Sequence, residues 1–419
     1  MDNPVPDYLA EVAEACASLT SGAPASYIPE LAAVDPDRYG VAMATIDGTL
    51  YSVGDARHEF TIQSISKAFV YGLAVRERGL TEVLRKVDVE PSGDPFDELS
   101  LEDGTGRPRN PMINAGAITT HALVGGAGVS SAGRFEEIHR LLCDLAGREL
   151  SVDEEVWASE MSVSDRNLAI AHLLRSHGII SDSPEEVVSA YVRQCAVLVT
   201  AEDLAMMAAT LANAGVQPVT GQRIFSGQQV RHLLSVMLTC GMYDSAGDWV
   251  SNVGIPAKSG VGGGIIGALP GQVGIATFAP RLDPHGSSVR GIETFERLSH
   301  DMGLHLMEVA PPARSVIQRS RVVGEGEEAV RVFELAGTIG FTGAERVVRR
   351  LAEEEPVERT IVVDLTHVSS VGGPARHMLL EALRRLRLDG YTVYLIDHDE
   401  VLPDPDPGDG QPVEQLQEI

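Results

Sequence analysis

Residues 39–53 are YGVAMATIDGTLYSV, two apolar runs on either side of an Asp-Gly dipeptide. Asp-Gly between two such runs is typical of the tight turn of a β-hairpin. A second pair of apolar runs lies much later, at 255–278, on either side of a Pro-Gly dipeptide. We therefore expect one sheet that is built from both ends of this segment.

Helical patterns fill the sequence between the two pairs of strands. Apolar residues recur every three or four positions in several stretches. These stretches are 64–76, 134–147, 166–176, 184–195, 201–214 and 228–240. Strands at both ends and helices between them predict an α+β domain, in which an antiparallel sheet carries a helical subdomain.

A second pattern begins after the helical order ends near Met307. Residues 309–321 contain two consecutive prolines and little periodicity, and are interpreted as a linker. Strands and helices then alternate at 329–335, 342–354, 360–365, 374–388 and 391–396. This order predicts a small α/β domain over 322–402. Residues 403–419 are rich in Asp, Pro, Gly and Gln, and predict a disordered acidic tail.

The composition excludes several classes of protein. The 419 residues carry 33 Lys and Arg against 60 Asp and Glu, a formal net charge of −27. This acidity argues against sequence-independent binding to nucleic acid or to an anionic membrane, because both need clustered cations. The four Cys residues lie far apart, so neither a disulfide scaffold nor a metal site is expected.

Location is predicted from two further features. The first residues show no basic and apolar signal segment. The charge-free stretch 259–280 is long enough to suggest a membrane span, but its seven glycines and its central Pro-Gly favour a buried hairpin. We therefore expect a cytoplasmic protein without a membrane span.

Lysine is scarce in this chain. Of the 33 Lys and Arg residues only three are lysines, namely Lys67, Lys86 and Lys258. A lysine retained among so many arginines can mark a position that needs an amine able to lose its proton. Two of the three lysines fall in motifs where that difference matters.

The first motif is Ser64-Ile65-Ser66-Lys67, an S-x-x-K sequence at the start of a helical run. Residues three apart share a helical face, so the Ser64 hydroxyl and the Lys67 amine can meet. A neutral lysine can take the hydroxyl proton, and a helix N-terminus offers N–H groups to a developing oxyanion. Alone, the motif is weak because Ser and Lys are common residues, and it favours a surface serine beside a solvated lysine.

The second motif is Lys258-Ser259-Gly260, at the opening of the second hairpin. Lys-Ser/Thr-Gly on an edge strand accompanies S-x-x-K in serine β-lactamases and penicillin-binding proteins. The Ser-Asp-Asn triplet of that set is interrupted here by an Arg, within 162–167. Those enzymes are also usually exported, so the chain departs from them in two respects.

Longer stretches identify the family that the chain resembles. They are YIPELA at 27–32, QSISK at 63–67, EPSG at 90–93, NPMINAGA at 110–117, SE at 159–160, DRN at 165–167, MAATLAN at 207–213, CGMYD at 240–244 and PAKSGV at 256–261. Over residues 8–305 the chain closely resembles the serine-dependent glutaminases, which share the β-lactamase/penicillin-binding-protein-like fold.

The resemblance implies a catalytic role for five matched residues. Ser64 is expected to be the nucleophile that forms a glutamyl ester, with Lys67 as its activating partner. Tyr27 and Tyr243 match two active-site tyrosines, and a tyrosine near a lysine can pass a proton to the departing ammonia. The backbone N–H groups of Ser64 and Val261 would form the oxyanion hole.

The resemblance also implies how the substrate is held. The residues matched to those that bind the α-amino and α-carboxylate groups are Asn114, Glu160, Asn167 and Tyr191. Ser64, Tyr243 and Val261 would contact the substrate as well. The supporting residues would be Gln63, Lys258, Ser259 and Gly260. No metal or organic cofactor is implied.

Residues 330–396 resemble the STAS domain of sulfate transporters and anti-sigma-factor antagonists. The match rests on FELAG at 333–337 and IVVDLTHV at 361–368. In the antagonists a serine in the loop before the next helix is phosphorylated, whereas Gly373 stands nearest to that position here. We therefore expect a role in regulation or interaction, with a protein or small ligand as partner. A fused oligomerisation module is the alternative.

The sequence thus predicts an enzyme with a glutaminase domain at 1–308 and a STAS domain at 322–402. It would hydrolyse L-glutamine to L-glutamate and ammonia, as a homodimer or homotetramer and without a nucleic-acid partner. Two alternatives remain open at this point. One is a β-lactamase-like enzyme that acts on D-Ala peptides or β-lactams, and the other is a catalytically silent signalling protein.

Overall fold

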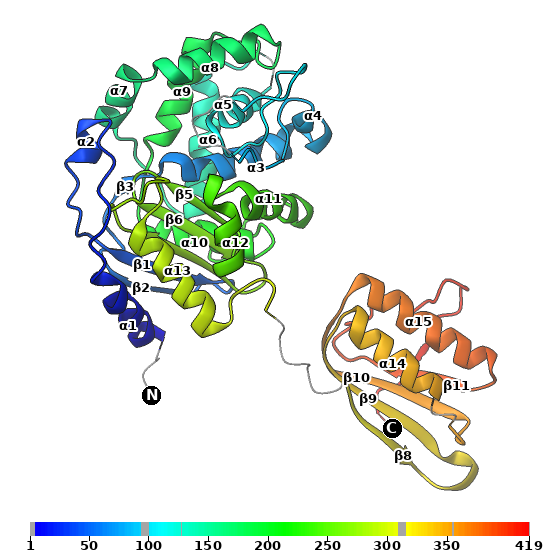
Figure 1. The fold of residues 1–419 in the computed structure, drawn as a ribbon. Coiled ribbons are helices and arrows are strands. Elements are labelled where there is room, and N and C mark those ends of the chain that lie inside the picture. The colour runs from blue at the N-terminus through cyan, green and yellow to red at the C-terminus, as the bar shows by residue number, and fades with distance from the viewer. Residues whose placement is uncertain (1–4, 94–99, 127, 309–315, 354–355, 419) are drawn as a thin grey trace. The chain divides into compact units, whose positions relative to one another are not determined.

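The computed structural model describes residues 5–93, 100–126, 128–308, 316–353 and 356–418. The chain forms two compact units, residues 1–308 and 309–419 (Figure 1). Each unit has hydrophobic clusters of its own. We describe the two units separately.

The first unit is built on a five-stranded antiparallel sheet in the order β2-β1-β7-β6-β5. Its strands are β1 (Gly40–Thr45), β2 (Leu50–Gly54), β5 (Ala257–Gly260), β6 (Gly264–Leu269) and β7 (Val273–Phe278). β1 pairs with β7, with Met43 opposite Ile275. The two predicted hairpins therefore join in one sheet, and the charge-free stretch at 259–280 contributes to three of its strands.

Helices cover both faces of this sheet. α1 (Val5–Ala17) and α13 (Val289–Met302) share a core with Val41 and Met43 of β1. α10 (Ala201–Ala212) packs on the opposite face, where Ala42 and Ala44 point. A Cβ atom on Gly274 of β7 would overlap the backbone of α10. Glycine at this position therefore lets the helix lie directly on the sheet.

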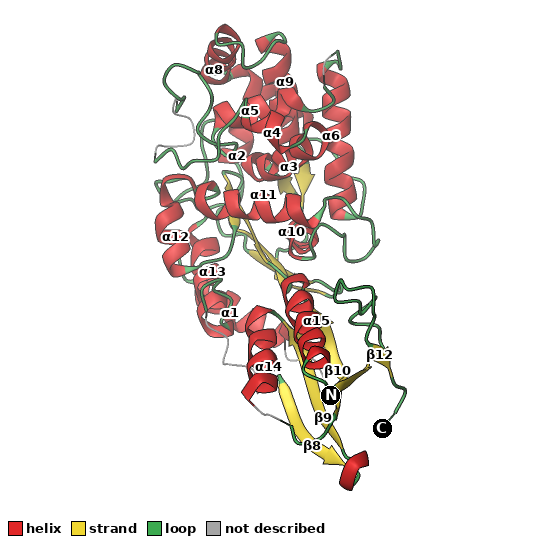
Figure 2. Cartoon of the chain, turned by 90° about the vertical axis from the view of Figure 1, so that its right-hand side faces the viewer, coloured by secondary structure: helices red, strands yellow, loops and turns green. Residues whose placement is uncertain are grey.

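The remaining helices of the first unit gather beyond α10 and form the helical subdomain (Figure 2). They are α3 (Ser66–Arg78), α4 (Leu80–Leu84), α5 (Asn114–Leu123), α6 (Ser131–Ala146), α7 (Glu154–Ser162), α8 (Asp165–Ser176), α9 (Pro184–Cys195) and α11 (Gly227–Cys240). The short elements are α2 (Pro29–Ala32), α12 (Ala246–Asn252), the 3-10 turns η1 (Gln63–Ile65) and η2 (Tyr243–Ser245), and the paired strands β3 (Phe60–Thr61) and β4 (Leu198–Val199). The predicted α+β class and all six predicted helices are confirmed.

The second unit is a five-stranded sheet in the order β12-β11-β10-β9-β8. Its elements are β8 (Ile317–Val323), η3 (Gly326–Glu328), β9 (Val330–Ile339), α14 (Phe341–Glu353), β10 (Thr360–Val371), α15 (Gly373–Leu388), β11 (Thr392–Ile396) and β12 (Glu414–Gln415). β9, β10 and β11 run parallel, and the two crossover helices pack together on one face. This arrangement confirms the predicted small α/β fold.

Two segments differ from the sequence-based expectation. Within the expected linker, residues 309–315 lie outside the described residues, but Ile317 already begins β8, which pairs antiparallel with β9. Within the expected disordered tail, Val413 is buried and the next two residues form β12 beside β11. A single apolar residue and a two-residue strand carry no periodicity that a sequence can show.

Among the helices of the described ranges, none is both long and apolar enough to cross a membrane.

Candidate active site

Ser64 lies in the 3-10 turn η1, between β3 and α3. Gln63 has a φ of +49°, in the left-handed region that residues other than glycine rarely adopt. The helix was expected to begin at Ser64, but it begins at Ser66 because the preceding turn is tighter. Ser64 therefore stands on a sharp bend at the start of α3.

Two buried side chains lie beside Ser64. Lys67 is fully buried, and its Nζ donates to Asn114 Oδ1 at 2.7 Å and lies 3.5 Å from the Tyr243 hydroxyl. The Ser64 hydroxyl is near enough to the Tyr243 hydroxyl to lower its pKa, but burial has the larger effect and raises the pKa of Tyr243 above its usual value. Ser64, Tyr243 and Lys67 thus lie in succession, each side chain near the next.

Tyr243 is held in place by close packing between the end of α11 and β5. A Cβ atom on Gly241 would overlap the carbonyl oxygen of Ala257, so only glycine allows this approach. Tyr243 itself has a φ of +54°. Lys258 of β5 is fully buried, and its Nζ lies 3.9 Å from the centroid of the Tyr243 ring. Burial, together with the charge of Lys67, lowers the pKa of Lys258 well below its usual range.

Glu160 of α7 brings a carboxylate to the same region. Its Oε1 accepts hydrogen bonds from the Tyr27 hydroxyl at 2.7 Å and from Gln63 Nε2 at 3.2 Å. Burial raises the pKa of the Glu160 carboxyl. Burial of the Tyr27 hydroxyl, reinforced by the Glu160 charge, raises the pKa of Tyr27 as well, although 47% of this residue is exposed. Tyr27 therefore presents its hydroxyl inward and its ring outward.

Two side-chain amides connect Lys67 to the helices α5 and α8. Asn114 is the first residue of α5, and Asn167 lies in the first turn of α8. Asn114 Nδ2 donates to Asn167 Oδ1 at 3.0 Å, while Asn114 Oδ1 accepts from Lys67. The helix starts of α5 and α8 therefore carry neutral hydrogen-bonding groups to the site.

Several of the side chains described above line a cavity of about 340 Å³. It is lined by Tyr27, Gln63, Ser64, Asn114, Glu160, Val163, Ser164, Arg166, Asn167, Tyr191, Val192, Cys195 and Val261. Eight of these thirteen residues were predicted, so the structure assembles the expected set from positions far apart in the sequence. Lys67 and Tyr243 connect to the lining through the contacts given above.

Ser259 and Gly260 occupy β5 next to Lys258 but do not line this cavity. Lys258 Nζ donates to the Ser259 carbonyl at 2.7 Å. The Ser259 hydroxyl is buried and has no hydrogen-bond partner among the residues that the structure describes. A Cβ atom on Gly260 would lie 3.2 Å from the Ile62 carbonyl oxygen. The small size of Gly260 therefore lets the strand lie close to the turn that carries Ser64.

Five residues of the lining were not predicted from the sequence. Two of them, Arg166 and Cys195, bring a guanidinium group and a thiol to the cavity. Arg166 was interpreted as an interruption of a Ser-Asp-Asn triplet and as part of the DRN match, but it was given no role, although it is adjacent to Asn167 in the first turn of α8. Cys195 lies one helical turn after Tyr191, a spacing that places both on one face of α9. Burial raises the pKa of Cys195 to about 12, so its thiol stays protonated.

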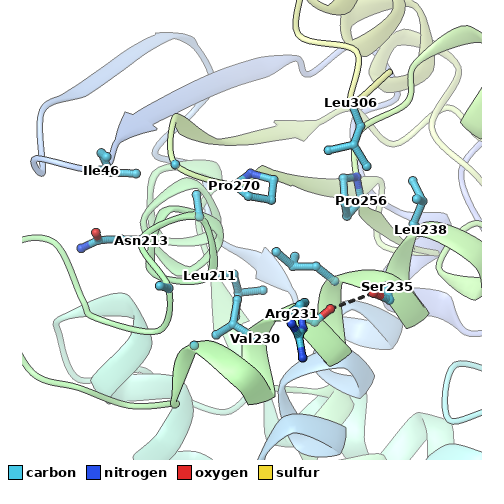
Figure 3. A pocket seen from close by; sticks show the side chains of 15 residues that line it. Ile46, Leu211, Asn213, Val230, Arg231, Ser235, Leu238, Pro256, Pro270 and Leu306 are labelled. Atoms are coloured by element: carbon cyan, nitrogen blue, oxygen red, sulfur yellow. Dashed lines mark hydrogen bonds between the residues drawn. The ribbon is translucent and has the colours of Figure 1, made fainter. Parts of the chain in front are cut away.

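Another cavity, of about 450 Å³, lies between α11, the end of α10 and the β6–β7 turn (Figure 3). Its lining is mostly apolar and includes Val230, Leu234, Leu238 and Pro270. None of the predicted site residues lines it. In the described ranges there is also no cluster of three or more His, Cys, Asp or Glu side chains that could hold a metal ion.

Comparison with known protein families identifies the class of protein to which this fold and this cavity belong. Residues 22–307 match the family model described as Glutaminase, and residues 321–403 match the STAS domain. The first match covers more than half of the chain. The chain therefore belongs to the glutaminase family and is a glutaminase with a C-terminal STAS domain.

Individual relatives agree with this assignment. A glutaminase of Corynebacterium glutamicum is 47% identical over 401 residues, which cover 96% of each chain. A glutaminase of Trichormus variabilis is 50% identical over 291 residues, 70% of this chain and 86% of that relative. A crystal structure of a protein called Mglu superposes with a TM-score of 0.87 at 47% identity, and covers 96% of this chain and 100% of that one.

Proposed function

We propose that this glutaminase hydrolyses L-glutamine to L-glutamate and ammonia through an ester on Ser64. The observation that carries the proposal is the contact path from Ser64 through the Tyr243 hydroxyl to Lys67. Ser64 lines a cavity that also contains Glu160, which suits the α-ammonium group of an amino acid. The site thus offers a nucleophile, a route for its proton and a carboxylate for the substrate.

In the first half of the reaction, Ser64 Oγ attacks the carboxamide carbon of the substrate. The hydroxyl proton passes through Tyr243 to the Lys67 amine in its neutral form. The backbone N–H groups of Ser64 and Val261 hold the oxyanion. When the carbon–nitrogen bond breaks, the proton returns along the same path to the leaving nitrogen, and ammonia departs.

In the second half, water attacks the ester carbon. Its proton follows the path to Lys67 and then returns to Ser64 Oγ as the carbon–oxygen bond to the enzyme breaks. Glutamate and free Ser64 are formed. The sum is glutamine plus water to glutamate plus ammonia, with no oxidant, reductant or further group consumed.

Substrate recognition would depend on four residues of the lining. Within the described part of the chain, both hydrogen bonds to the Glu160 carboxylate go to Oε1, so Oε2 can accept the substrate ammonium. Asn114, Asn167 and Tyr191 line the same cavity and offer neutral donors to the α-carboxylate. Recognition of both charged groups would select a free amino acid over a peptide.

Ammonia release from L-glutamine, with L-asparagine as the control substrate, tests the proposal in wild-type protein and in Ser64→Ala. We expect glutamine-selective release by the wild type and none by the variant, which should still bind glutamate. Mass spectrometry after acid quench should find a glutamyl adduct on the peptide that contains Ser64. Appreciable turnover by Ser64→Ala would overturn the nucleophile assignment.

We further propose that residues 309–419 serve regulation or interaction rather than catalysis. The support is that the hydrophobic clusters of this unit contain none of the residues of the catalytic cavity. A homodimer or homotetramer of the full chain is part of the same proposal, and light scattering tests it.

A further inference from the structure

A buried series of polar side chains leads from His121 to the turn that carries Ser64. His121 of α5 is fully buried, and its Nδ1 lies 2.9 Å from Gln194 Oε1 of α9. Gln194 Nε2 donates to Ser66 Oγ at 2.9 Å. Ser66 Oγ in turn donates to the Gln63 carbonyl oxygen at 2.7 Å. Three side chains from three helices therefore end on one backbone carbonyl.

The donor and acceptor chemistry of these groups allows only one direction for the hydrogen bonds of this series. An amide oxygen only accepts and an amide nitrogen only donates, so His121 carries its proton on Nδ1. Burial lowers the pKa of His121 to about 4, so the ring is neutral, and its Nε2 has no partner among the described residues. Because Ser66 accepts from Gln194, its one proton is free to reach the Gln63 carbonyl.

A neighbouring thiol does not compete for that proton. Cys195 lies within hydrogen-bond reach of Ser66. Burial raises the pKa of Cys195 to about 12, so the thiol keeps its own proton and can donate it to Ser66. The hydroxyl proton of Ser66 therefore stays available for Gln63.

The Gln63 carbonyl belongs to the same planar peptide as the Ser64 N–H. No cis peptide bond occurs in the described ranges, so this C=O and this N–H point in opposite directions. The Gln63 carbonyl accepts from both the backbone N–H and the side-chain hydroxyl of Ser66. Two donors on one carbonyl fix the rotation of the peptide, and with it the direction of the Ser64 N–H.

Such a restraint matters because Gln63 is in the left-handed region, with a φ of +49°. A residue other than glycine keeps this conformation only where its surroundings over-determine it. The Gln63 side chain is held by Thr61 and Glu160, but those contacts leave the peptide that follows Gln63 free to rotate. The series that ends at Ser66 acts on that peptide.

We propose that Ser66, Gln194 and His121 are positioning residues that aim the Ser64 N–H at the oxyanion formed on the substrate. This inference depends on the proposed function, because it takes the Ser64 N–H as an oxyanion donor. The three side chains do not line the catalytic cavity and act only through the peptide between Gln63 and Ser64.

The expected kinetic effect depends on the step at which negative charge develops on the substrate oxygen. The oxyanion exists in the transition state but not in bound glutamine, so a misdirected donor lowers kcat and leaves KM nearly unchanged. Complete loss of one oxyanion donor lowers kcat about 100- to 1000-fold in other enzymes. A donor that is loosened rather than lost should cost less, and we expect about a tenfold fall in kcat.

The first test compares Ser66→Ala with Ser299→Ala in the full chain. Ser299 is a matched control, because it is also buried and its Oγ donates to the Val253 carbonyl at 2.6 Å, outside the cavity. Ser66→Ala should lower kcat about tenfold at nearly constant KM, and Ser299→Ala should leave kcat unchanged. Equal kcat values for the two variants, or a rise in KM alone, would overturn the proposal.

The second test is a double-mutant cycle with Gln194→Met, which removes both hydrogen bonds at similar side-chain volume. If Gln194 acts through Ser66, Gln194→Met lowers kcat on its own but not further in the Ser66→Ala background. If the two substitutions lowered kcat independently, so that their effects multiplied in the double variant, Gln194 would not act through Ser66. If Gln194→Met fails to fold, as thermal unfolding would show, the comparison of Ser66→Ala with Ser299→Ala decides alone.

Ser64→Ala in the same assay separates this inference from the proposed function. Turnover by Ser64→Ala would remove the basis of both. An inactive Ser64→Ala beside a Ser66→Ala that behaves like Ser299→Ala would refute the positioning role and leave the nucleophile in place.

Discussion

The Nζ atom of Lys258 lies 3.9 Å from the centroid of the Tyr243 ring. Lys67 approaches the same ring, with its Nζ 5.5 Å from the centroid, and both lysines are fully buried. Two ammonium groups so close together in a protein interior repel each other, so protonation of one disfavours protonation of the other. Burial, and after it the charge of Lys67, lowers the pKa of Lys258 well below its usual range. The arrangement therefore disfavours protonation of the Lys258 amine beside Tyr243.

The proposed role of Lys67 as the base for Ser64 predicts that arginine cannot replace it. The guanidinium group does not release its proton in proteins, so Lys67→Arg keeps a charge but loses the base. We expect kcat for ammonia release to fall at least ~100-fold, within the range of general-base catalysis. Lys86→Arg is the control, because Lys86 Nζ donates to the Gly178 carbonyl outside the cavity. Similar kcat values for the two variants would contradict the role of Lys67.

The hydroxyl of Tyr243 stands between Ser64 and Lys67, so its removal should interrupt the proton path. Tyr243→Phe keeps the ring that Lys258 contacts and removes only the oxygen. We expect kcat to fall about 100-fold with little change in KM. Tyr71→Phe is a matched control, because Tyr71 is buried and its hydroxyl lies 2.6 Å from His232 Nε2, outside the site. A Tyr243→Phe variant that turns over as fast as Tyr71→Phe would exclude the tyrosine from proton transfer.

The candidate motifs around Ser64 and Lys258 could be recognised in the sequence because their spacing is local. Ser64 and Lys67 lie three residues apart, and the scarcity of lysine drew attention to Lys67 and Lys258. The contact of Tyr27 with Glu160 joins positions 133 apart, and no spacing or periodicity indicates it. Those residues were predicted only through the resemblance to a known family. Arg166 was not predicted to line the cavity, because it was interpreted as an insertion in a Ser-Asp-Asn triplet.

The bend before Ser64 shows why part of the site could not be predicted. Glutamine has no intrinsic preference for a positive φ, so Gln63 gives no sign of its left-handed conformation. The side chains that lead to its carbonyl through Ser66 are Gln194 and His121, which lie on helices distant in the sequence. The amphipathic helices and the two hairpins, in contrast, follow from local patterns, and the structure contains them.

Substrate binding should weaken at low pH because of Glu160. The ionised carboxylate binds the α-ammonium group and the protonated carboxyl does not, so KM for glutamine should rise as pH falls through the pKa of Glu160. Burial raises this pKa, so the rise in KM begins at a higher pH than an ordinary glutamate would give. Steady-state kinetics across pH measures it. A wild-type KM that stays flat through the acidic range would contradict the assignment.

Replacement of Glu160 tests the same interaction without a change of pH. Glu160→Gln should raise KM about 10- to 100-fold, the value of a charge-assisted hydrogen bond of 1.5–3 kcal/mol. Its KM should also lose the dependence on acidic pH. Glu155→Gln, an exposed position on the same helix, should behave like the wild type.

The sheet of the first unit should depend on Gly274. A Cβ atom there would overlap the backbone of α10, so Gly274→Ala must displace the helix from β7. We expect a loss of about 1–3 kcal/mol in the free energy of unfolding, typical of an overpacked core. Gly247→Ala in α12 is the control, because a Cβ atom there meets nothing within 4 Å and alanine favours a helix. Denaturant unfolding compares the two variants, and equal stability would refute the close approach.

A chain that ends at Glu308 should retain glutamine-selective ammonia release. All residues of the catalytic cavity lie before that point, and the hydrophobic clusters of residues 1–308 contain no described residue of the second unit. A unit with its own core can fold alone, so the shortened chain should show nearly the kcat of the full chain, and neither should act on asparagine. Comparable kcat but altered KM or oligomeric state would assign regulation or assembly to the STAS domain. Loss of turnover in a shortened chain that still unfolds cooperatively would show that the domain is needed for catalysis.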